Sequence, residues 1–171
     1  ACAAITVTCL DNGTSRRLEP GAPLPGQRLA ALQRLADEGV AVSARIDPII
    51  PGINDSQIED LVSAVCRAGA AHITSSTFKA RPGSLKRISS AFPEEWEALR
   101  GIFERGELIS GSIYLPVDLR RSLMERVKAA TEEEGATFSS CREGAAPPAG
   151  IKCDGTHLIN AMPASNSRAG P

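Results

Sequence analysis

The sequence predicts an α/β fold in which parallel strands form part of a barrel. Segments with the two-residue alternation of strands are followed by segments with helical spacing of apolar residues, and this order favours right-handed crossovers and a parallel sheet. Hydrophobic residues make up 42% of the chain but aromatic residues only 4%, which is typical of a core packed with small aliphatic side chains.

The first strand and helix are indicated by the first forty residues. Apolar residues alternate with Thr6 and Thr8 over residues 5–9, which predicts a strand. Residues 12–26 are rich in Gly and Pro and are expected to form a loop. Leucines then recur at helical spacing up to Gly39, where a helix would end in a left-handed cap.

A second strand and helix follow directly. Residues 40–46 alternate small apolar side chains with polar ones, and the segment from Asp55 onward has apolar residues at i, i+3, i+4 and i+7 until Gly69. Ser56 and Glu59 have the spacing of a capping box at the start of that helix.

The remaining pattern predicts a third strand, two further helices and a short last strand. Their expected ranges are 71–78, 93–103, 117–134 and 136–140. The chain therefore divides into a barrel part over 1–141, a closing segment rich in Cys and Gly over 142–160, and a flexible tail over 161–171.

Composition restricts the classes of function. The 19 basic and 20 acidic residues nearly cancel, so non-specific nucleic-acid binding driven by net charge is not expected. There is no apolar run of membrane-spanning length and no leader pattern, which favours a cytoplasmic protein, and five cysteines without a CxxC pair favour reduced thiols. Because a strand begins within the first residues, we expect the chain to be a fragment.

One face of the predicted sheet carries polar side chains. Ser43, Arg45 and Asp47 share a face of the second strand, and His72, Thr74 and Ser76 share a face of the third. A face of this kind either meets solvent or lines the interior of a barrel, where ligands bind at the carboxyl ends of the strands. A guanidinium such as Arg45 needs a partner there, which is either Asp47 or an anionic ligand.

Several stretches resemble one family. The stretches "ITVTCLDNGTSRRLEPGAPLPGQRLAALQRLADEGV", "VSARIDPIIPGINDSQIEDLVSAVCRAGA" and "HITSSTFKARPGSLKRI" are similar to the later barrel strands of radical S-adenosylmethionine enzymes, in the group of spore photoproduct lyase and DNA-repair-lyase-like relatives. The resemblance covers about residues 4 to 160 and includes the ending "FSSCREG…KCDGTHLI".

The resemblance implies a (β/α)6 partial barrel that reductively cleaves S-adenosylmethionine at a [4Fe-4S] cluster and generates a 5′-deoxyadenosyl radical, in a lyase-like enzyme whose substrate could be a DNA photoproduct. The family's CxxxCxxC cluster loop is missing from this sequence. The cluster ligands are therefore expected in an amino-terminal half of the same protein, and the chain alone is expected to be inactive. The substrate would be a small molecule or a nucleic acid.

The resemblance also implies roles for residues on the polar face. Residues near the cofactor would be Thr8, Ser43, Arg45, Asp47, Ile49 and Pro51. Thr74 and Ser76 would lie on the substrate side.

Three further features leave alternatives open. Cys141, Cys153 and His157 are weak candidates for metal ligands, because a fourth ligand is missing and a plain structural role fits them as well. The basic residues Lys79, Arg81, Lys86 and Arg87 suit either a nucleic-acid backbone or a solvated loop. A non-catalytic binding or assembly module with a polar sheet face is the main rival to an enzyme, whereas a Schiff-base aldolase fragment is disfavoured because no inward strand position carries Lys.

Overall fold

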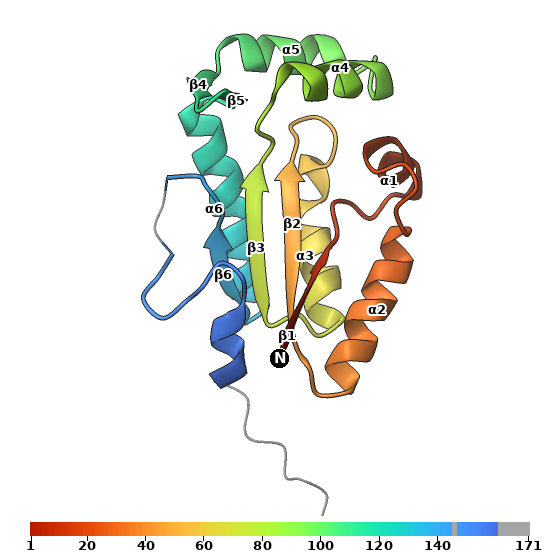
Figure 1. Cartoon of the computed structure of the whole chain (residues 1–171), viewed down its shortest axis with the longest axis vertical. Helices are drawn as coiled ribbons and strands as arrows, with labels where there is room; N and C mark the ends of the chain where they lie inside the picture. Colours follow the sequence, from red (N-terminus) through yellow and green to blue (C-terminus); the bar gives the residue numbers. More distant parts are fainter. Residues whose placement is uncertain (145–146, 161–171) are drawn as a thin grey trace, which may run out of the picture.

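The computed structural model describes residues 1–144 and 147–160. It contains a parallel sheet with the strand order β1-β2-β3-β6, which confirms the predicted α/β class (Figure 1). The strands are β1 (Cys2–Thr6), β2 (Ala41–Ile49), β3 (His72–Thr77) and β6 (Thr137–Ser140).

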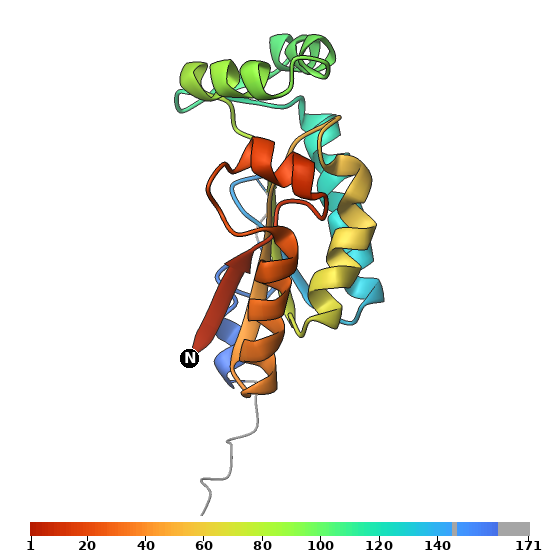
Figure 2. The same cartoon turned by 90° about the vertical axis from the view of Figure 1, so that its right-hand side faces the viewer.

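Each successive strand of this sheet adds on the same side of the one before it. Three helices fill the crossovers, namely α2 (Pro25–Asp37), α3 (Ile58–Arg67) and α6 (Val117–Glu133). Because right-handed crossovers that all progress in one direction place their helices on one face, these three helices lie together on one side of the sheet (Figure 2). In the described part of the chain, the other face carries no α-helix and is covered in part by the segment around the 3-10 helix η2 (Thr156–Asn160).

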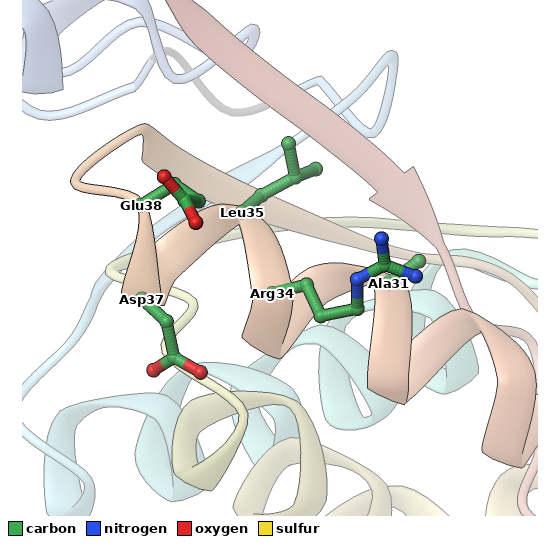
Figure 3. A pocket seen from close by; sticks show the side chains of 5 residues that line it. All are labelled: Ala31, Arg34, Leu35, Asp37 and Glu38. Carbon is green, nitrogen blue, oxygen red and sulfur yellow. The ribbon is translucent and has the colours of Figure 1, made fainter.

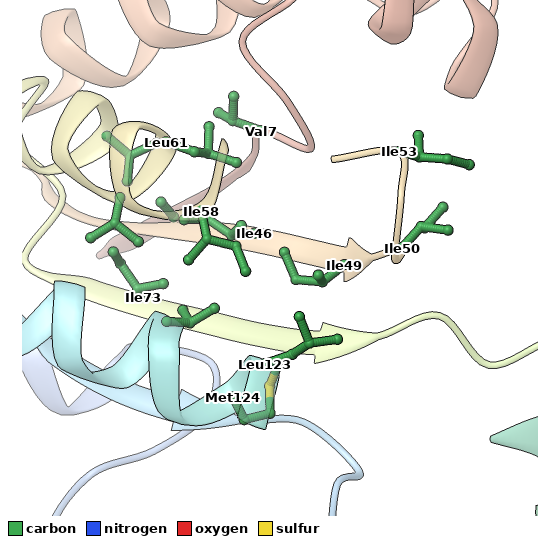
Figure 4. Close-up of a cluster of buried hydrophobic side chains, with 14 of the residues drawn as sticks. Val7, Ile46, Ile49, Ile50, Ile53, Ile58, Leu61, Ile73, Leu123 and Met124 are labelled. Carbon is green, nitrogen blue, oxygen red and sulfur yellow. The ribbon is translucent and has the colours of Figure 1, made fainter. Parts of the chain in front are cut away.

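The hydrophobic core lies between the sheet and these helices. Val42, Ala44 and Ile46 of β2 and Ile73 of β3 point into it, and all four are buried. The apolar positions predicted for α3 pack in the same core and are also buried: Ile58, Leu61, Val62 and Val65. Figure 4 shows Ile58 and Leu61 beside Ile46.

The opposite sheet face carries the polar side chains that the alternation predicted. In-register pairs join Thr6 to Arg45, Ser43 to His72, and Arg45 to Thr74. Residues paired in register share a face, and β6 adds Thr137 and Ser139 to it. We call this set of residues the polar face; it comprises Thr6, Ser43, Arg45, His72, Thr74, Thr137 and Ser139.

Residues 82–114 form a small unit above the carboxyl ends of the strands, which we call the roof (Figure 1). Its elements are α4 (Pro82–Ala91), α5 (Trp96–Glu104), β4 (Glu107–Ile109) and β5 (Ser112–Tyr114). Leu99 and Phe103 of α5 are buried, and Trp96 packs on the core, so this helix turns one face toward the rest of the chain.

The structure corrects several sequence-based expectations. Residues 12–26 are not a continuous loop, because α1 (Asn12–Leu18) forms there and Asp11 caps it by accepting a hydrogen bond from Thr14 N at 2.6 Å. The segment that carries Lys86 and Arg87 is helix α4 rather than a loop. The first strand is β1, Cys2–Thr6, so Thr8 lies just beyond its end.

The predicted capping box also fails to form. A short 3-10 turn, η1 (Asp55–Gln57), precedes α3, and the N-cap residue Gln57 makes no side-chain cap. Glu59 instead forms an ion pair with Arg126 of α6. Within the described residues, no helix is both long and apolar enough to cross a membrane.

Candidate functional site

A hollow of about 790 Å³ opens at the carboxyl ends of β1 and β2, beneath the roof. Its inner wall contains Thr8, Glu19 and Asp47, and its apolar part contains Pro48, Ile50, Phe78 and Ile88. The outer wall, from α1 and α4, contributes Arg17, Lys86 and Arg87. The hollow thus joins Thr8 and Asp47, which were predicted as site residues, with residues from two helices that the sequence did not reveal.

A second hollow lies on the outside of α2 and does not approach the strand ends. It measures about 480 Å³ and is lined by Ala31, Arg34, Leu35, Asp37 and Glu38, whose charged side chains diverge rather than converge (Figure 3). Because a ligand site in this class of fold is expected at the carboxyl ends of strands, the hollow beneath the roof is the better candidate.

The inner wall of that hollow is made of hydrogen-bond acceptors. Thr8 Oγ1 donates to Glu19 Oε2 at 2.6 Å, which commits the only hydroxyl proton and leaves the oxygen as an acceptor. Arg28 holds Glu19 in place through an ion pair at 3.0 Å. Sequence analysis missed Glu19, and its signal was the polar "RRLEPG" stretch before the first crossover helix.

Asp47 adds a second carboxylate to the same wall. Its Oδ2 pairs with Arg45, while Oδ1 has no hydrogen-bond partner among the described residues. Burial lowers the pKa of Arg45, but the hydrogen bond and charge of Asp47 outweigh this effect and raise it overall, with a further contribution from Cys141. Arg45 does not line the hollow, so of the two partners expected for it the structure shows Asp47.

A buried asparagine fixes the two strand ends relative to each other. Asn54 donates to Thr8 O at 2.8 Å and to Pro48 O at 3.0 Å, and its Oδ1 accepts from Ile50 N at 2.7 Å. Its side chain is fully buried, so all of its hydrogen-bonding groups serve this connection. Asn54 therefore sets the position of Thr8 and Pro48 at the hollow.

Ile49 and Pro51 do not line the hollow. The pairing of β2 with β3 shifts between Ile46 and Ile49, which marks a bulge, and a bulge reverses the alternation of side chains beyond it. Ile49 consequently points into the core and Pro51 is buried, while Pro48 and Ile50 contact the hollow.

Residues 152–158 cover the amino-terminal part of the polar face, and we call them the floor. Thr74 Oγ1 donates to Cys153 O, and Gly155 lies so close to Ser43 that an added Cβ would be 2.8 Å from Ser43 Cβ. Ser43 and Thr74 are buried under this segment and do not reach the hollow. Ser76, further along β3, is half-buried and does not line the hollow either.

Two histidines link the floor to the sheet. His72 is fully buried, with Nδ1 2.8 Å from Thr137 Oγ1 and Nε2 3.1 Å from Ser139 Oγ. Its ring meets that of His157 edge to face at 4.7 Å. Burial, together with the nearby His157, lowers the pKa of His72 to about 4, so its imidazole is neutral at pH 7.

The structure does not assemble the candidate metal ligands. His157 accepts from Lys152 N and contacts Thr137, the Cys153 side chain is exposed, and Cys141 lies beyond β6 beside Arg45. In the ranges 1–144 and 147–160 no three His, Cys, Asp or Glu side chains are grouped as metal ligands.

The basic residues after β3 lie in three different settings, and one of them, Arg81, donates from Nε to Ser112 Oγ at 3.3 Å. Lys79 pairs with the buried Glu143 at 2.6 Å, and Glu143 also accepts from Thr77, so these groups connect the ends of β3 and β6. Lys86 and Arg87 line the hollow. Glu143 was not singled out from the sequence, because no local pattern shows that a glutamate in the loop after the last strand has a buried side chain.

Comparison with known proteins gives no match to a protein-family model, a curated protein or a solved structure.

Proposed function

We propose that this chain forms the later strands of a radical S-adenosylmethionine barrel and supplies walls for the cofactor and the substrate. The strand order supports the barrel, because strands that add in one direction with all helices outside form a wall that can curve around an interior. The polar face would be the lining of that interior.

The observation that carries the proposal is the acceptor-only inner wall of the hollow. Thr8, Glu19 and Asp47 present oxygens whose complement is a ligand with hydroxyl or ammonium donors and positive charge. S-adenosylmethionine has ribose hydroxyls, an α-ammonium group and a sulfonium centre, while Pro48 and Ile50 offer an apolar surface for a purine. The donors of the cofactor therefore match the acceptor oxygens of the wall, and its purine matches the apolar part of the hollow.

The [4Fe-4S] cluster is not accommodated by this chain's own side chains. No set of three candidate ligands is grouped among the described residues, so the ligands would come from an amino-terminal half of the same protein. When bound, the cluster supplies the electron for reductive cleavage of S-adenosylmethionine. The residues described above would bind and orient the cofactor, and the roof would exclude water from it.

The test uses the protein that joins this chain to a half containing CxxxCxxC. After anaerobic iron reconstitution it should be brown and should convert S-adenosylmethionine to 5′-deoxyadenosine with a reductant, whereas the present chain should not. Asp47→Asn should weaken cofactor binding by about ten- to a hundredfold, since a charge-assisted hydrogen bond is worth about 1.5–3 kcal/mol. Glu38→Gln, just past the end of α2 and away from the hollow, is the matched control. Binding that is weakened in the control but not in Asp47→Asn, or no binding by the unsubstituted joined protein, would refute the proposal.

Arg45→Ala tests the role that the resemblance assigns to Arg45. Because Arg45 holds Asp47 from outside the hollow, its removal should weaken cofactor binding without unfolding the protein. Unchanged affinity would show that Asp47 is positioned without it.

A binding module without catalysis is the second candidate, and the internally hydrogen-bonded polar face favours it. Ser43, His72 and Thr74 are all occupied by internal contacts, so the recognition groups are limited to the hollow. Cofactor binding without turnover in the longer, reconstituted protein would identify this case.

A further inference from the structure

The hollow has walls of opposite charge. Glu19 and Asp47 lie on the strand side, whereas Lys86 and Arg87 lie on the roof side. Glu19 and Asp47 are already paired, with Arg28 and Arg45. Lys86 and Arg87 form no ion pair with any described acidic residue, although they are neighbours on the same helix.

Arg17, the third cation that lines the hollow, is engaged in contacts within the protein. Arg17 donates to Ala91 O at 2.7 Å, lies 4.0 Å from the centre of the Phe92 ring, and pairs with Glu95. Arg17 therefore fixes α4 against α1, and the unpaired positive charge of the hollow is left to Lys86 and Arg87.

We propose that Lys86 and Arg87 bind a phosphate group of the substrate, an inference that rests on the proposed function. The carboxylate of S-adenosylmethionine carries a single negative charge, so it can neutralise only one of the two cations. A phosphate monoester carries up to two charges, and successive phosphodiesters of a nucleic-acid strand carry one each, so either can neutralise both cations. Arg and Lys are the side chains that bind phosphate oxygens. The substrate would place this group under α4, with its reacting part toward the acceptor wall.

The test measures binding of glycerol 3-phosphate and of a ten-nucleotide single strand to the present chain by calorimetry, with glycerol as the uncharged control. Binding of either phosphate probe, but not of glycerol, is expected. The double substitution Lys86→Gln with Arg87→Gln should weaken it at least tenfold. Arg34→Gln, which lies on the far side of α2, should leave it unchanged.

The two probes separate the sources of the phosphate. Preference for the strand indicates a phosphodiester, and preference for glycerol 3-phosphate indicates a small monoester. Unaltered phosphate binding in the double variant, or no binding of either probe, overturns the inference. An equal loss of affinity for S-adenosylmethionine in the double variant would also overturn it, since the cations would then serve the cofactor's carboxylate.

Failure of the proposed function gives a different pattern. The protein could bind phosphate through Lys86 and Arg87 and yet show no affinity for S-adenosylmethionine. That result would support the phosphate site and refute the proposed cofactor.

Discussion

Gly155 shows how closely the floor is fitted to the polar face. Its φ of +74° disfavours any other residue, and a Cβ would lie within 3.0 Å of Ser43 Oγ as well as closer still to Ser43 Cβ. Gly155→Ala should therefore combine backbone strain with a steric clash, and the cost should be about 2–4 kcal/mol in the free energy of unfolding.

Gly150→Ala is the control for that prediction. Gly150 also has a positive φ, of +81°, but nothing lies within 4 Å of an added Cβ, so only the strain of about 1–2 kcal/mol is expected. Urea denaturation of both variants measures the difference, and equal destabilisation would contradict the close approach to Ser43.

His72 should make stability depend on pH. Because its pKa in the folded chain is about 4, below the ordinary 6.5, the unfolded chain binds a proton more readily. Stability should be complete above pH 6.5 and should fall as the pH drops toward 4, by up to about 1.4 kcal/mol per pH unit.

The measurement is urea denaturation of the chain and of His72→Gln at several pH values between 7 and 4.5. Glutamine retains hydrogen-bonding groups but does not titrate, so the variant should lose most of the slope. An identical slope in the two proteins would assign the effect to other groups, among which His157 and Asp154 lie nearest.

Single residues were predictable from the sequence where alternation holds. The polar positions of β2 and β3 are on one face as expected, because a strand period of two needs no tertiary information. The burial of Ile49 and Pro51 was not predicted, because the bulge before them is a property of strand pairing. Glu19 and Asn54 act through contacts with residues far along the chain, at Thr8 in both cases, which no local pattern encodes.

At the scale of elements, the helices with regular apolar spacing were predictable, whereas α1 and α4 were not. Apolar spacing identified α2, α3 and α6 to within a few residues of their ends. The helices α1 and α4 are rich in Gly, Ser and charged residues, so their sequences resemble loops. They are held by tertiary contacts, chiefly by the attachment of Arg17 to the end of α4.

That attachment can be tested by hydrogen exchange. Arg17→Lys keeps the charge but loses the planar group that stacks on Phe92 and bonds to Ala91 O, so α4 should open more easily by about 1 kcal/mol. Amides of residues 82–91 should exchange several-fold faster, while those of α3 should not change. Arg16→Lys, at the exposed neighbouring position of α1, is the control.

At the scale of the whole molecule, the parallel sheet was predictable but its curvature was not. The β-α order implies parallel strands, whereas closure depends on strands that this sheet does not contain in its described part. Outside the described residues lies 161–171, the tail expected from composition.

We expect the chain to self-associate through β1, which lies at the edge of the sheet. Its residues Cys2–Thr6 include no charge and no proline, the usual features that keep an open edge from pairing. The chain should therefore associate as its concentration rises, and Ala4→Lys, at an exposed position of β1, should shift this to higher concentration. Sedimentation velocity of both proteins tests this, and monomers at all concentrations for the unmodified chain would contradict it.

The one-sided placement of the helices has an evolutionary consequence. Along β2 and β3, every second residue packs against the helices, while those between face the other side of the sheet. At residues that line the hollow but not the core, such as Asp47 and Lys86, substitutions can alter what the protein recognises while its architecture persists. A lineage built on this plan can diversify its chemistry residue by residue, with each step tolerated by an unchanged scaffold.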